Sequence, residues 1–286
     1  MGEFLRALAD LPFLRQALLA GLATSVTAGV IGSLVVTRRM ATAAGGLAHA
    51  VLGGMGIAYW LSTARGVSGV HPMHGALVAA VICALVLARS RAQGKERDDT
   101  TISVLWALGM AVGVLFLART PGYRSDLMGY LLGNILLVDP VALRWLLGLD
   151  LATVVVLWLF HDQIIATSFD PEFARLRGLD VGLWEAVILV LVAVTVVSLV
   201  YVVGIVMVIA LLTLPAATAS RFTTRMFSLM IGAVVLSALI TTGGLALSYR
   251  WDLPTGAVDV LVAVLIYLLA LAVDRPAVRR RLPGGV

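Results

Sequence analysis

Three ionisable side chains lie inside long apolar runs: His49 in LAHAVLGGMG, Asp150 in LLGLDLATVVV and Asp259 in TGAVDVLVAV. An ionisable group inside a membrane is costly, and it indicates a functional site by default. Imidazole is a good ligand for zinc and other borderline metals, and carboxylate oxygens suit harder divalent ions such as manganese. His49, Asp150 and Asp259 are therefore candidate metal ligands.

Each of these residues also has a structural interpretation. His49 could form a hydrogen bond between helices, to a threonine or a backbone carbonyl. Asp259 lies near the start of its run, so its carboxylate could simply reach water, whereas Asp150 lies deeper. A second group, His71, Met73 and His74 in VHPMHGA, could pass a metal on, but two histidines without a third ligand make a poor site.

The composition places these residues in a membrane protein. Of the 286 residues, 60% are hydrophobic and 13% are charged, which is about half the fraction of charged residues in a typical soluble domain. The apolar runs do not alternate as the strands of a membrane β-barrel do, so the predicted class is an all-α polytopic protein. The +5 net charge comes from scattered basic residues, which excludes a nucleic-acid-binding stripe, and the lone Cys83 excludes a disulfide framework.

About 20 apolar residues are needed to cross a membrane. Nine segments meet this requirement, with eight or ten left open as counts: 16–37, 44–62, 72–89, 100–118, 140–160, 183–202, 204–220, 227–248 and 256–273. Residues 126–138 are apolar but short, and we predict a half-helix or re-entrant segment there. Residues 1–15 are expected to form an interfacial helix, and the whole chain is expected to be one transmembrane domain.

The positive-inside rule orients these segments. One set of loops carries 14 of the 21 basic residues, including the tail 274–286, and we place it in the cytoplasm. With nine crossings, the N-terminus is then outside and the C-terminus inside.

A polar island at 161–182 separates two apolar runs on the predicted cytoplasmic side. Within it, 169–180 is expected to form a short charged helix that begins at Asp170 and Pro171 and ends at Gly178. A charged helix held between two spans is suited to docking a soluble partner. The residues assigned to this role are Asp170, Glu172, Arg175, Arg177 and Gly178.

One further element is a proline in the run 204–220. Pro215 removes a hydrogen bond from its helix, and Thr213 and Thr218 could satisfy the freed carbonyls. We expect a bend near a cytoplasmic gate, with a static kink as the alternative.

Four stretches in order resemble the permease subunits of the metal-type ABC importers, which take up zinc, manganese or iron. They are RRMATAAGGLAHAVLGGMG (38–56), DLMGYLLGNILLVD (126–139), FDPEFARLRGLD (169–180) and VVGIVMVIALLTLPAATASR (202–221), the last followed by SYRWDLPTGA (248–257). Many members carry an acidic residue four positions before the histidine of the first motif. Here that position is Gly45, and only His49 remains.

The resemblance implies a permease in a bacterial-type inner membrane, with lipid around it. It implies a second permease copy, an ABC ATPase docked on the 169–180 helix, and an extracytoplasmic metal-binding protein. The chain contains no G-x-x-x-x-G-K-[ST] motif, so ATP is expected on the separate ATPase, and the permease itself is expected to be non-catalytic. No tightly bound cofactor is expected, since zinc or manganese passes only transiently. Open alternatives are a permease for a chelated substrate such as a siderophore or vitamin B12, an ion-gradient-driven transporter, and a membrane scaffold.

Overall fold

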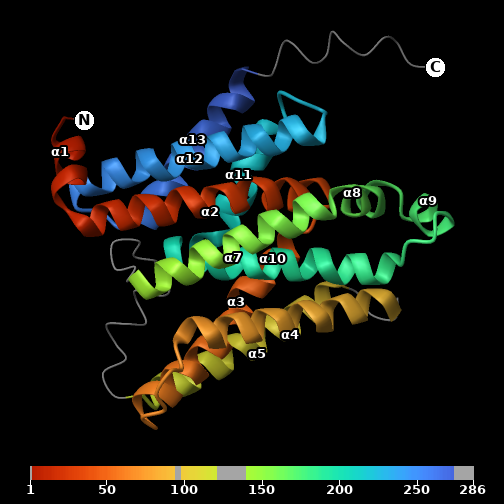
Figure 1. Cartoon of the computed structure of the whole chain (residues 1–286), viewed down its shortest axis with the longest axis horizontal. Helices are drawn as coiled ribbons and strands as arrows, with labels where there is room; N and C mark the ends of the chain where they lie inside the picture. The colour runs from red at the N-terminus through yellow and green to blue at the C-terminus, as the bar shows by residue number, and fades with distance from the viewer. Residues whose placement is uncertain (1, 94–97, 121–139, 274–286) are drawn as a thin grey trace.

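The computed structural model describes residues 2–93, 98–120 and 140–273, and every regular element within them is a helix. Eight of these helices are long and apolar enough to cross a membrane, which confirms the all-α polytopic class. They are α2 (Pro12–Thr37), α3 (Ala41–Thr63), α4 (Pro72–Gln93), α5 (Asp98–Ala118), α7 (Pro140–Leu159), α10 (Val181–Val203), α12 (Met226–Trp251) and α13 (Thr255–Val273) (Figure 1).

The segment 204–220, predicted as a ninth full span, has a different construction. Gly204 adopts φ 84°, which ends α10, and the 3-10 turn η2 (Ile205–Met207) follows. Helix α11 (Val208–Ala219) has 12 residues and rises about 18 Å, short of the ~30 Å hydrocarbon core. It packs against α2, α12 and α13, so neighbouring helices surround this shorter passage.

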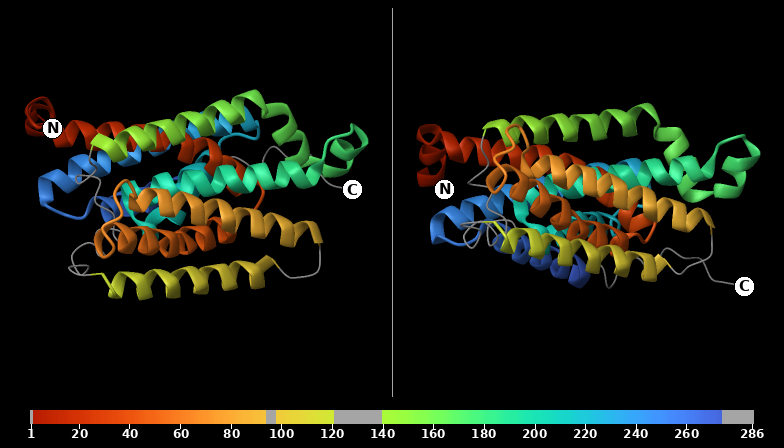
Figure 2. Two further views of the ribbon diagram at one scale, coloured as in Figure 1. Left: turned by 60° about the horizontal axis from the view of Figure 1, so that its bottom comes forward. Right: turned by 90° about the horizontal axis from the view of Figure 1, so that it is seen from below.

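The long helices run between two ends of the molecule, and consecutive ones point in opposite directions except α10 and α12, which run the same way because the short α11 lies between them (Figures 1 and 2). At one end lies α1 (Gly2–Asp10), and we call this the α1 end. At the other lie α8 (His161–Phe169) and α9 (Pro171–Leu176), and we call this the α9 end. Contacts agree with this view, because the C-terminal ends of α2 and α4 meet the start of α10 at the α9 end.

The basic loops that the sequence analysis placed on one side lie together at the α9 end, as far as the described residues reach (Figure 1). The chain starts at the α1 end, and α13 runs toward the α9 end. Helix α5 ends and α7 begins at the α1 end, but the half-helix predicted at 126–138 lies outside the described residues, as does the basic tail 274–286. The predicted interfacial helix over 1–15 is shorter, because α2 already begins at Pro12.

Helices α2, α3 and α10 form the interior of the bundle, and most of the apolar stretch of each is buried. The outer helices α4, α5, α7 and α13 instead expose large apolar side chains along their length, as is expected where lipid is the solvent. Helix α10 contacts α2, α3, α4 and α7, so it connects the elements that carry the candidate residues.

Candidate functional site

His49 lies midway along α3, half-buried against α5. Its imidazole stacks flat on the Trp106 indole, with ring centroids 4.3 Å apart and planes 3° from parallel. The His49 Nδ1 is buried and has no hydrogen-bond partner among the described residues. The structural interpretation of His49 requires a hydrogen bond to a neighbouring helix, and at Nδ1 the described residues provide none.

Glycines hold α3 close to its neighbours. Gly53 faces Gly109 of α5, and a Cβ at either position would meet the other helix's backbone. Gly54 and Gly75 of α4 are paired in the same way, each against the other's carbonyl oxygen. Small residues let helices in a membrane approach closely, so α3, and His49 with it, is fixed between α4 and α5.

Gly45 lies one turn before His49, where the resemblance leads one to expect an acidic side chain. A Cβ at this position would lie 2.6 Å from Ile209 Cδ1 of α11. The Ile209 side chain thus fills the space that a carboxylate would need. The described structure offers no acidic ligand from position 45, in agreement with the sequence.

Asp150 lies deep in α7 and is buried. Its Oδ1 accepts a hydrogen bond of 3.0 Å from the Thr27 hydroxyl of α2. Ser198 of α10 lies beside the carboxylate, and both Asp150 Oδ2 and the Ser198 hydroxyl are buried without a hydrogen-bond partner in the described chain. Asp150 therefore joins α2, α7 and α10 through a polar contact that is only partly satisfied.

Asp259 of α13 is fully buried, so the interpretation in which its carboxylate reaches water is wrong. The carboxylate turns inward against α12, where Gly244 has no side chain to obstruct it. Neither carboxylate oxygen has a hydrogen-bond partner among the described residues.

The structure does not collect these three residues into one site. His49 lies between α3 and α5, Asp150 contacts α2, and Asp259 packs on α12. Within the described part of the chain, no group of three or more His, Cys, Asp or Glu side chains is placed to hold a metal ion. A metal site at His49 would therefore need ligands that come from beyond these residues.

The short charged helix predicted within 169–180 is present as α9. The Asp170 side chain caps it by accepting a hydrogen bond of 2.9 Å from the Phe173 N–H, and Pro171 occupies its first position. Gly178, at φ 81°, terminates it, and the Arg177 guanidinium lies 4.8 Å from the centre of the Phe173 ring. The local sequence signals of capping and termination thus act as predicted.

The tip of this segment is more apolar than the sequence analysis recognised. Leu176 is 88% exposed, and Phe169 and Phe173 are about half exposed. Charged Glu172 and Arg175 stand beside them, also exposed. This mixture of apolar and charged groups at the end of the molecule resembles a surface that another protein covers.

Comparison with known proteins places this architecture in a family. The model of the family described as "ABC 3 transport family" matches residues 10–274. The chain belongs to the ABC 3 transport family. It is therefore a multi-pass membrane permease of an ABC transport system, and this assignment decides against the ion-gradient-driven transporter and the scaffold.

Individual relatives cover nearly the whole chain. A "probable metal transport system membrane protein" of Chlamydia pneumoniae is 36% identical over 257 residues, which cover 90% of this chain and 87% of that protein. A manganese transport system membrane protein, MntC, of Halalkalibacterium halodurans is 30% identical, over 93% of this chain and 89% of the other. The solved structure of PsaBC from Streptococcus pneumoniae in complex with Fab matches with a TM-score of 0.86 and 25% identity, over 98% of this chain and 99% of that one.

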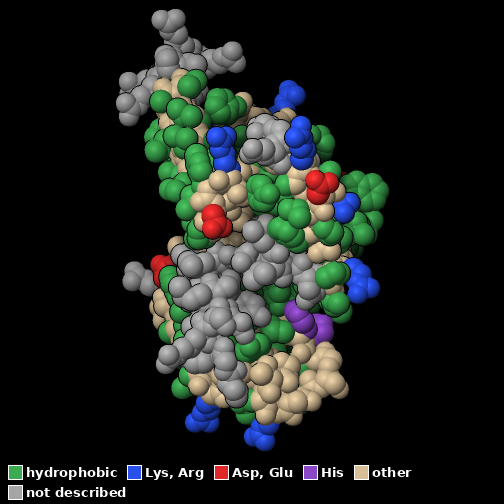
Figure 3. Space-filling model, turned by 90° about the vertical axis from the view of Figure 1, so that its left-hand side faces the viewer, with side chains coloured by type: hydrophobic (Ala, Val, Ile, Leu, Met, Phe, Trp, Pro, Cys, Tyr) green, Lys and Arg blue, Asp and Glu red, His purple; other side chains and the backbone are tan. Residues whose placement is uncertain are grey.

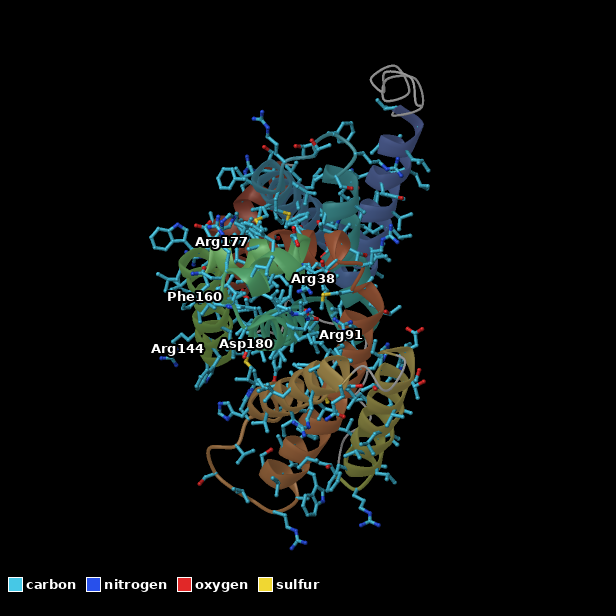
Figure 4. All side chains as sticks on the ribbon, turned by 90° about the vertical axis from the view of Figure 1, so that its right-hand side faces the viewer. Arg38, Arg91, Arg144, Phe160, Arg177 and Asp180 are labelled. Carbon is cyan, nitrogen blue, oxygen red and sulfur yellow. The ribbon has the colours of Figure 1, made fainter. Side chains whose placement is uncertain are left out.

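Within this ABC 3 family fold, sequence reasoning missed the ion pairs of Glu185. On the second turn of α10, Glu185 pairs with Arg38, just beyond α2, and with Arg91, near the end of α4. Figure 4 looks onto the α9 end and shows both arginines near its middle. A signal was available, because Arg38, Arg91 and Glu185 all lie at predicted span ends on the same side.

His71 and His74 lie just before and within the first turn of α4, at the α1 end, where histidine is visible on the surface (Figure 3). The Met73 N–H donates to His71 Nδ1 (3.3 Å) and the His71 N–H donates to His74 Nδ1 (3.4 Å), while the Tyr201 hydroxyl lies 3.4 Å from His71 Nδ1. A nitrogen that accepts carries no proton, so each neutral ring holds its proton on Nε2. In this arrangement both Nδ1 atoms accept backbone hydrogen bonds, which favours a structural role over metal transfer.

Pro215 lies inside α11, and the helix continues through it. The Thr213 hydroxyl donates to the Ile209 carbonyl (2.6 Å) and the Thr218 hydroxyl to the Leu214 carbonyl (2.8 Å). The carbonyl that Pro215 leaves without its helical donor is that of Leu211, four residues earlier. The two threonines therefore bond to other carbonyls than the one expected, and the role of Pro215 at a gate stays a prediction.

Proposed function

We propose that this chain is the permease subunit of an ATP-driven importer for a divalent transition metal, with manganese or zinc as the substrate. The observation that carries the proposal is α9, a capped, charged helix with an exposed apolar tip, in a permease of this family. Relatives named as metal and manganese transport proteins support the choice of substrate class.

The proposed partners follow from the division of labour in such a transporter. An ABC ATPase docks on α9 through Asp170, Glu172, Arg175 and Arg177, and it alone binds ATP. A second permease copy completes the pore, an extracytoplasmic protein delivers the metal at the α1 end, and lipid surrounds the apolar outer helices. The α9 end then faces the cytoplasm, with the N-terminus outside and the C-terminus inside.

We infer that His49 contacts the metal in transit. Its Nδ1 has no partner in the described chain, and its ring is partly accessible beside Trp106. Because the described residues assemble no group of three or more His, Cys, Asp or Glu side chains, we infer that the remaining ligands are water or groups that lie outside the described residues or in the second copy. A loose site suits a transporter, since binding must be weak enough for release. Asp150 and Asp259 are the candidate carboxylates for other points of the path.

The test is ATP-dependent uptake of manganese, zinc and iron into liposomes that contain the permease with its ATPase. We compare the parent with His49→Ala, using His161→Ala as a matched control, because His161 is exposed at the α9 end and its ion-pair partner among the described residues is Asp162. Uptake of one metal that is lost in His49→Ala and kept in His161→Ala supports the importer and the site. Unchanged uptake in His49→Ala removes His49 from the path, and a parent that moves no metal while its ATPase is bound points to a chelated substrate.

A further inference from the structure

We propose that Glu185 is a positioning residue that transmits movement of α9 to the helix carrying His49. This inference rests on the proposed function, and it names a link between the ATPase-docking helix and the metal path.

The first step of the link is the connection from α9 to α10. Only four residues separate the two helices, and their backbone is bonded into both. The Gly178 N–H donates to Arg175 O (2.9 Å) and the Leu179 N–H to Ala174 O (3.0 Å). The Asp180 side chain then caps α10, accepting from the N–H groups of Gly182 and Leu183.

A ring contact reinforces this connection from the other side. Trp184, in the first turn of α10, packs on Phe160, at the junction of α7 and α8, with ring centroids 5.3 Å apart. Ala174, on the inner face of α9, is buried as well. A displacement of α9 is therefore passed to the start of α10, because the joint between them has few backbone groups free to rearrange.

The second step is the carboxylate of Glu185. Its Oε2 pairs with the Arg38 guanidinium, and its Oε1 accepts from Arg91 Nη1 at 2.7 Å. All three side chains are largely shielded, with 15–18% of their surface exposed. Ion pairs with two charge-assisted contacts in a shielded position hold their geometry better than exposed pairs. One carboxylate thus fastens the start of α10 to the ends of both α2 and α4.

The third step leads from Arg38 to His49. Arg38 stands in the tight turn between α2 and α3, where the Met40 N–H donates to Val35 O (2.8 Å) and Arg39 adopts φ 55°. Helix α3 begins at Ala41 and carries His49 two turns further on. Arg91 is connected to α3 by a second route, because α4, which carries Arg91, packs closely on α3 where Gly54 meets Gly75. The two ion pairs of Glu185 therefore reach α3 indirectly, one through the turn that precedes it and the other through α4.

These contacts form a contiguous path from α9 through α10 and Glu185 to α3. Coupling along such a path is measured as an energy, by comparing single and double substitutions. Its specific claim is that Glu185, Arg38 and Arg91 act as one unit in converting ATP hydrolysis into transport.

The experiment measures metal uptake and ATP hydrolysis in the same proteoliposomes and takes their ratio. Glu185→Gln keeps the shape of the side chain and removes its charge. We expect at least a tenfold fall in metal moved per ATP, with the ATPase still bound and ATP hydrolysis within about threefold of the parent. Glu185→Asp, which keeps the charge, is expected to recover part of the ratio. Asp162→Asn is the matched control, since this carboxylate is almost fully exposed at the same end and, in the part of the chain that the structure describes, its ion-pair partner is His161.

A double-mutant comparison separates transmission from general instability. Arg38→Gln alone is expected to lower the ratio, and adding it to Glu185→Gln is expected to lower the ratio no further, because both remove the same link. Losses that multiply would overturn the proposal, as would a Glu185→Gln transporter that moves as much metal per ATP as the parent. A variant in which uptake and hydrolysis fall equally would show a merely structural role. If the parent shows no ATP-dependent uptake, the proposed function fails rather than this link.

Discussion

Leu176 provides the sharpest quantitative test of the proposed docking surface on α9. This side chain is 88% exposed, so almost all of it is available to be covered by a partner. Leu176→Ala removes roughly three carbon groups, each worth about 0.8 kcal/mol when buried, which amounts to about 2 kcal/mol for complete burial. Since every 1.4 kcal/mol is a factor of ten in affinity, we expect the ATPase to bind about 30-fold more weakly.

The assay is an equilibrium titration of fluorescently labelled ATPase subunit onto permease held in lipid nanodiscs. Because Leu176 contacts little of its own chain, the substitution is expected to change the free energy of unfolding of the permease by less than about 0.5 kcal/mol. Leu261→Ala makes the same chemical change on α13, at a side chain that is 70% exposed, and is expected to leave ATPase affinity unchanged. An affinity within twofold of the parent for Leu176→Ala would refute the assignment of this tip as a docking surface.

Two further predictions concern the packing that places His49 and Asp150. Gly54→Leu is expected to destabilise the permease strongly, because any Cβ there overlaps the Gly75 backbone. Gly148→Leu is the control and is expected to be tolerated, because Gly148 of α7 faces open space. Thermal unfolding in detergent measures both variants, and equal stability would show that α3 and α4 can separate. Thr27→Val removes the hydrogen bond to Asp150 and is expected to lower the free energy of unfolding by about 1 kcal/mol. Thr27→Ser keeps the hydroxyl and preserves the hydrogen bond. A Thr27→Val protein as stable as the parent would mean that the bond contributes nothing to stability.

Features that depend on neighbouring residues along the chain could be predicted from the sequence. Runs of about 20 apolar residues predict spans because the membrane requires that length. Asp170, Pro171 and Gly178 predict the limits of a short helix because capping and termination are local. The segment 204–220 met the length criterion for a span, but it forms a shorter helix. Gly204 separates it from α10, and the helix packs among α2, α12 and α13.

Features that depend on contacts between distant segments could not be predicted in this way. Glu185 meets Arg38 and Arg91 across 147 and 94 residues of chain, and only the packing of α2, α4 and α10 brings them together. Asp259 is buried because Gly244, on another helix, leaves it room. The exposure of Leu176 follows from how far α9 projects from the bundle, which composition alone does not reveal.

The glycine contacts of α3 also bear on how this permease can evolve. At Gly54 and Gly75 each added side chain would strike the other helix's backbone, so no change at the partner position can make room, and the two sites must be retained together. At Gly45 the obstacle is the movable end of Ile209, which a smaller residue would withdraw. An acidic side chain at position 45 is therefore expected to need two substitutions, Gly45→Asp with Ile209→Ala, and no change in the packing of the helix backbones.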